Sequence, residues 1–125
     1  MKSVLLIFDD QKELEFIEAN LVENDFEVLK SDNLNDALIL AEENAPELIV
    51  TNTIDNESKL RLFSIQIQTE RLKNTTLLSL IELEDYLKSA VPNHFVIKPV
   101  RPKLLLSLIR GIMNNETTNW LPSFH

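Results

Sequence analysis

Short apolar runs alternate with amphipathic segments along most of the chain. Each run holds only three to five apolar residues, the pattern of strands that are buried on both faces of a parallel sheet. The expected strands are residues 4–8, 26–29, 48–50, 77–80 and 95–97.

Helices are expected between these strands. Residues 11–24 place Leu14, Ile17 and Leu21 on one helical face. Residues 31–33 offer N-caps for a second helix that Pro46 closes, and Pro102 has the first-turn position of the last helix.

Two further segments complete the helical pattern. Residues 58–73 are ambiguous, because residues 65–68 alternate as a strand would, but a crossover between parallel strands favours a helix. A short helix is expected at 83–90. Five strands alternating with five helices predict an α/β protein with a doubly wound parallel sheet over residues 1–114, followed by a tail at 115–125.

Composition narrows the class of protein. A length of 125 residues suits one domain, and a net charge of -8 with scattered basic residues argues against direct nucleic-acid binding. The chain has no cysteine and two histidines, so thiolate and histidine-built metal sites are not expected. No apolar run approaches the roughly 20 residues of a membrane span, and a cytoplasmic protein is predicted. The single glycine, Gly111, predicts that Asn and Asp serve the turns between strands and helices.

Polar side chains follow the strands where ligands bind in open parallel sheets. Asp9 and Asp10 follow the first strand, Asn52 follows the third, and Ser79 and Lys98 are assigned to the ends of the fourth and fifth. Two acids, an amide, a hydroxyl and an ammonium group are therefore expected to converge.

These residues and their order resemble the receiver domains of bacterial two-component response regulators. The matching segments are LLIFDDQ, PELIVTN, LLSL and FVIKP. The resemblance implies a flavodoxin-like (βα)5 fold with strand order 2-1-3-4-5. It also implies that Asp9 and Asp10 help to hold Mg²⁺, that Ser79 and Lys98 contact a phosphoryl group, and that Phe95 matches an aromatic residue that rotates on activation.

Asn52 departs from this family at the phosphoacceptor position. An aspartyl phosphate needs a carboxylate nucleophile, and the Asn carboxamide cannot form one. With one carboxylate fewer, Mg²⁺ binding should be weak, and no cofactor is required. Ser79 and Lys98 also lie closer together in sequence than is usual in the family, which predicts a trimmed fourth helix. The expectation is a non-enzymatic, atypical receiver that acts in signal transduction by binding proteins, independently of phosphorylation.

Several alternatives stay open. Asp55 could serve as an unconventional phosphoacceptor, whereas a flavin mononucleotide carrier is disfavoured because the loop after the first strand is acidic. Ser79 and Phe95 could be ordinary strand residues. The expected partner is a protein (a histidine kinase, an effector or a scaffold component). A homodimer could form through the fourth and fifth helices or through the tail, which carries Trp120, Leu121 and Phe124.

Overall fold

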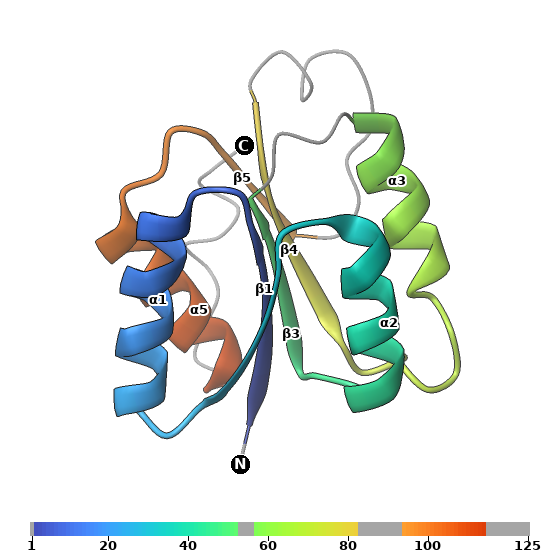
Figure 1. Cartoon of the computed structure of the whole chain (residues 1–125), viewed down its shortest axis with the longest axis horizontal. Coiled ribbons are helices and arrows are strands. Elements are labelled where there is room, and N and C mark those ends of the chain that lie inside the picture. Colours follow the sequence, from blue (N-terminus) through green and yellow to red (C-terminus); the bar gives the residue numbers. More distant parts are fainter. Residues whose placement is uncertain (1, 53–56, 83–93, 115–125) are drawn as a thin grey trace.

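The computed structural model describes residues 2–52, 57–82 and 94–114. Its strands form one parallel sheet in the order β2-β1-β3-β4-β5, which confirms the predicted flavodoxin-like α/β fold (Figure 1). The strands are β1 (Ser3–Phe8), β2 (Glu27–Ser31), β3 (Leu48–Asn52), β4 (Thr76–Ile81) and β5 (His94–Ile97).

Helices cover both faces of the sheet. On one side lie α1 (Gln11–Glu23) and α5 (Pro102–Met113), and on the other lie α2 (Leu34–Asn44) and α3 (Glu57–Gln66) (Figure 1). The predicted Leu14, Ile17 and Leu21 form the buried face of α1. Within the described ranges, no helix has the length and apolar character that crossing a membrane requires.

The alternation of side chains along the strands divides the core into two layers. Leu6, Val50 and Leu78 pack with α1 and α5. Their neighbours in sequence, Ile49 and Leu77, face α2 and α3 instead. A residue's position in its strand therefore decides which layer its side chain enters.

The turns after α1 and α2 use left-handed backbone at residues other than glycine. Asp25, which follows the C-cap residue Asn24 of α1, has φ 66°, and Ala45, the C-cap residue of α2, has φ 44°. Both lie in helix-to-strand turns, whereas the turns for which the sequence predicted Asn and Asp lead from strand to helix. Pro46 follows Ala45, at a place where prolines commonly follow a helix C-cap.

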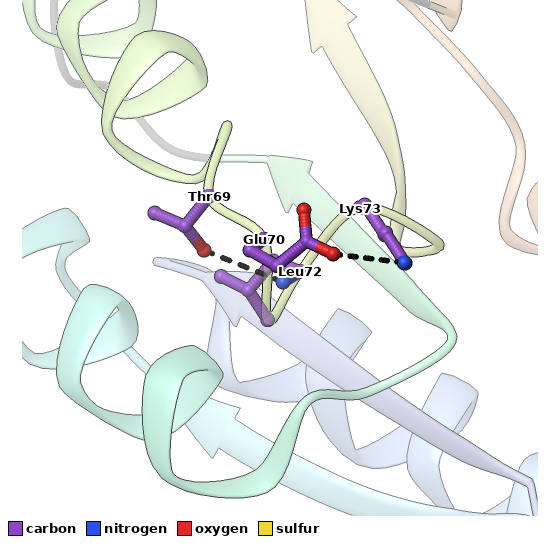
Figure 2. A network of polar contacts seen from close by, with 4 residues as sticks. All are labelled: Thr69, Glu70, Leu72 and Lys73. Carbon is purple, nitrogen blue, oxygen red and sulfur yellow. Dashed lines mark hydrogen bonds and ion pairs between the residues drawn. The ribbon is translucent and has the colours of Figure 1, made fainter.

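The helix predicted over residues 58–73 is shorter than expected. α3 ends at Gln66 and a series of turns leads to β4. In these turns the Thr69 hydroxyl accepts the Leu72 N–H at 3.3 Å, and Lys73 pairs with Glu70 at 2.9 Å (Figure 2). The same N–H also donates to the Thr69 carbonyl at 3.1 Å, so two oxygens of Thr69 hold it in a local turn, and such side-chain bonds let threonine compete with helix.

Several predicted features lie outside the described residues. These are the short helix at 83–90, Asp55 and the tail at 115–125 with its three large apolar side chains.

Candidate functional site

Asn52 ends β3 and meets a side chain from α1. The Asn52 Nδ2 donates a hydrogen bond to Oε1 of Glu13, 39 positions away in sequence. Asn52 lies on the same face of β3 as Leu48 and Val50, which face α1 and α5. β3 and the first turn of α1 therefore bring an amide and a carboxylate together.

A hollow of about 320 Å³ opens beside this pair. The described residues that line it are Glu13, Asn52, Leu80, Glu82, Lys98, Pro99 and Val100. Lys98 follows β5, and its Nζ lies 3.7 Å from a carboxylate oxygen of Glu82, which follows β4. The Lys98 side chain is 21% exposed and that of Glu82 is 64% exposed, so their ion pair lies at the mouth of the hollow.

The surroundings of Glu13 shift the pKa of its carboxyl group. Burial raises the pKa of its carboxyl group above the ordinary value of 4.5, and nearby Asp10 raises that pKa further. The hydrogen bond from Asn52 and the charge of Lys98 lower the pKa and partly offset these effects. Burial is the largest of the four, so the ionised carboxylate is less stable here than in water.

Asp9 and Asp10, the acidic pair after β1, lie in different surroundings. Asp10 is the N-cap of α1, and its Oδ1 accepts the N–H groups of Lys12 at 2.9 Å and Glu13 at 3.1 Å. Asp9 is exposed and lines a neighbouring groove at the ends of β1 and β2, together with Lys30 and Asp32. Neither aspartate is among the described residues that line the hollow beside Asn52.

The predicted placement of Ser79 at a strand end is wrong. β4 continues for two more residues, to Ile81, so Ser79 lies inside the sheet and is fully buried. It stands between Leu78 and Leu80, whose side chains face the α1 and α5 layer, so its own side chain enters the opposite layer. Within the described part of the chain its hydroxyl has no hydrogen-bond partner, and Glu82 occupies the position beside Lys98 that the sequence had assigned to a hydroxyl.

Phe95 pairs in register with Ser79 and is half-buried. It precedes Val96, which belongs to the α1 and α5 layer, so the Phe95 side chain lies on the same face of the sheet as Ser79. Phe95 is therefore separated from the hollow by the sheet.

The donor set fits Mg²⁺ poorly. This ion prefers octahedral coordination by oxygen, from carboxylates above all. Asn52 contributes no charge, and the Oδ1 of Asp10 is engaged with the backbone of α1. Among the described residues, acidic and histidine side chains form no group of three that could hold a metal ion.

Sequence reasoning brought Asn52 and Lys98 together correctly but missed Glu13 and Glu82. A signal for Glu13 was available, because it lies four residues before Ile17 and therefore beside the buried face of α1. Glu82 gave no such signal, since its position depends on where β4 ends.

Solved structures share this arrangement of strands and helices. The receiver domain of a signal transduction histidine kinase from Syntrophus aciditrophicus superimposes with a TM-score of 0.73 and 16% identity, over 95% of each chain. The chemotaxis response regulator CheY4 of Vibrio cholerae superimposes with a TM-score of 0.71 and 22% identity, over 90% of this chain and 98% of that one. The chain has the receiver fold.

Similarity in sequence extends to a much longer protein. The chain is 31% identical over 125 residues to "Histidine kinase P4" from Formosa agariphila, and the match covers 92% of this chain and 9% of that relative. No protein-family model matches the sequence. In the receiver fold of this chain, the carboxyl end of β3 carries Asn52 and the end of β4 carries Ile81.

Proposed function

We propose that the chain is a receiver-like signalling module that acts by binding a protein partner, without forming an aspartyl phosphate. The module has no catalytic activity of its own and needs no bound cofactor. Its fold is that of domains that relay signals in two-component systems. Among the described residues, the ends of β3 and β4 carry Asn52 and Ile81 in place of the carboxylate and hydroxyl that phosphoryl chemistry would use, although Lys98 is kept.

The observation that carries this proposal is the contact between Asn52 and Glu13. An amide at the end of β3 has no carboxylate oxygen with which to attack phosphorus. Its N–H is already donated to a carboxylate, so this amide is a fixed part of the site. Ile81, at the end of β4, offers no hydroxyl for a phosphoryl oxygen.

The test is the intact mass of the protein after incubation with Mg²⁺ and acetyl phosphate. The native chain is expected to gain no phosphoryl group, while a conventional receiver domain in the same tube confirms that the donor is active. Asn52→Asp runs alongside and reports whether the rest of the pocket still supports transfer.

A single phosphoryl group on the native chain would overturn the proposal. If it mapped to Asp55, the chain would be an unconventional phosphoacceptor, the alternative that its sequence leaves open. Fragmentation of the modified protein distinguishes Asp55 from other acceptors.

The partner we propose is a component of a histidine kinase pathway, either the kinase itself, an effector or a scaffold. Two similarities support this choice, since the relative from Formosa agariphila is a histidine kinase and the Syntrophus domain comes from one. The proposed setting is the cytoplasm, where such partners would be met. A homodimer through the face of the fourth and fifth helices, or through the tail at 115–125, is also part of the proposal.

A further inference from the structure

The hollow beside Asn52 contains charges of both signs. Glu13 and Glu82 contribute carboxylates, and Lys98 is the one basic side chain among the described residues that line it. The Lys98 ammonium lies 3.7 Å from Glu82 and also acts on the charge of Glu13. The positive charge of Lys98 therefore interacts with both carboxylates.

The carboxylate beside Asn52 enters from α1 and not from β3. Asn52 donates to Glu13 and so fixes where this carboxylate lies. The pocket keeps a negative charge next to β3, although the strand itself supplies only a neutral amide.

A divalent cation would meet two obstacles in this pocket. Lys98 already stands beside the carboxylates, and its ammonium repels a second cation at short range. Asp10 is close enough to act on the charge of Glu13, but its Oδ1 accepts two backbone N–H groups at the start of α1. An incoming Mg²⁺ would therefore have to displace an ion pair and weaken a helix cap.

We infer that the pocket is metal-independent, with Lys98 supplying the positive charge that balances Glu13 and Glu82, and with Asn52 positioning Glu13. This inference rests on the proposed function and deepens it, because it explains how the site stays assembled without a phosphoryl group or a metal ion. Lys98 and Asn52 are positioning residues in this arrangement.

The first measurement is the melting temperature of the native protein in EDTA and in MgCl₂, with NaCl added to equal ionic strength so that general screening is removed. Isothermal titration calorimetry with MgCl₂ accompanies it. The native protein is expected to show no saturable heat and a change in melting temperature below about 1 °C, because a ligand stabilises a protein only when it binds the folded state.

Lys98→Met removes the internal cation and keeps the length of the side chain. Its melting temperature in EDTA is expected to fall by about 3 °C, and MgCl₂ is expected to restore most of this loss, because Mg²⁺ can then approach the uncompensated carboxylates. Lys103→Met is the matched control, since Lys103 is exposed on α5 and outside the pocket. Lys103→Met should melt at the temperature of the native protein in EDTA, and MgCl₂ should not change its melting temperature.

Two further variants separate charge from packing. Lys98→Arg keeps the positive charge and should melt at the temperature of the native protein in both buffers. This comparison between Lys98→Arg and the native protein can be made even if Lys98→Met fails to fold. Adding Glu13→Gln to Lys98→Met removes one carboxylate and should abolish most of the recovery in MgCl₂.

Saturable Mg²⁺ binding that stabilises the native protein would overturn the inference. So would a Lys98→Met variant that melts like Lys103→Met, or one that is destabilised without recovery in MgCl₂, since Lys98 would then act by packing alone. These results are independent of phosphoryl uptake. The native chain could thus remain unphosphorylated and still bind Mg²⁺, and the two proposals fail separately.

Discussion

Glu13 couples the charge of the pocket to the stability of the fold. Its raised pKa means that the native state holds a proton on Glu13 more readily than the unfolded chain does, from pH about 4.5 up to that raised pKa. The unfolded chain binds fewer protons across this window, so the contribution of Glu13 to the free energy of unfolding falls as pH rises. Above the window the cost of burying the ionised carboxylate is constant.

Glu13→Gln is therefore expected to stabilise the protein at pH 7. The variant loses the buried charge but keeps an oxygen that accepts from Asn52. Its advantage in free energy of unfolding should shrink as pH falls towards 4.5, where native Glu13 is increasingly protonated. Urea unfolding at several pH values between 4 and 7 measures this difference.

Glu15→Gln is the control for that series. Glu15 also lies on α1, but it is exposed, and its hydrogen bond comes from the Gln11 side chain at 3.1 Å. Its difference from the native protein gives the baseline for removing an exposed carboxylate from α1. Equal pH profiles for the two variants would mean that Glu13 has no special environment in solution.

At the scale of single residues, the sequence predicted that Asn52 and Lys98 would lie close together. It did not predict that the carboxylates of Glu13 and Glu82 would lie beside them. Their meeting follows from parallel strands that end at the same edge of the sheet. Ser79 was misplaced because an apolar run does not mark its last residue, and β4 extends to Ile81. A shift of one or two positions decides which layer or loop receives a side chain.

At the scale of the elements, the ends of helices were harder to predict than their buried faces. The sequence anticipated the core side of α1 from Leu14, Ile17 and Leu21, because spacing alone determines it. It did not anticipate that α3 stops at Gln66, since the turns that follow depend on local bonds such as that between Thr69 and Leu72.

The C-terminal end of α2 gives a prediction at this scale. Ala45 adopts φ 44°, where its Cβ is crowded, while its N–H donates to the Ala41 carbonyl at 2.8 Å. Ala45→Gly relieves that crowding and keeps the hydrogen bond, and it should raise the free energy of unfolding by about 1 kcal/mol.

Ala41→Gly is the opposite control, because Ala41 is buried within α2 and has helical backbone. It should lower the free energy of unfolding by about 1 kcal/mol or more. Chemical denaturation of both variants measures the two changes. Destabilisation by Ala45→Gly would show that packing of the Ala45 methyl group against the α2 and α3 layer outweighs the crowding of the left-handed turn.

At the scale of the whole molecule, the same strands build both layers of the core. β1, β3 and β4 send alternate side chains to the α1 and α5 side and to the α2 and α3 side. Periodicity predicted this architecture because strands buried on both faces are apolar at nearly every position. Neither layer has a sheet of its own, so the two should fold as one unit.

Leu6→Ala and Leu77→Ala test this expectation, one in each layer. Both side chains are fully buried, and each truncation should cost about 2–5 kcal/mol. Circular dichroism and the NMR signals of methyl groups in both layers should report the same single transition for each variant. Loss of one layer's signals before the other's would show that the layers unfold separately.

The order of the strands also leaves β2 with β1 as its single partner among the described strands. The outer edge of β2 therefore offers backbone donors and acceptors to which a foreign strand could add. Glu27 and Lys30 are exposed along this short strand, and Lys30 is tied to Glu18 of α1 at 3.1 Å. Adding a strand there would bury these charges, so β2 carries its own protection against amyloid-like growth at the sheet edge.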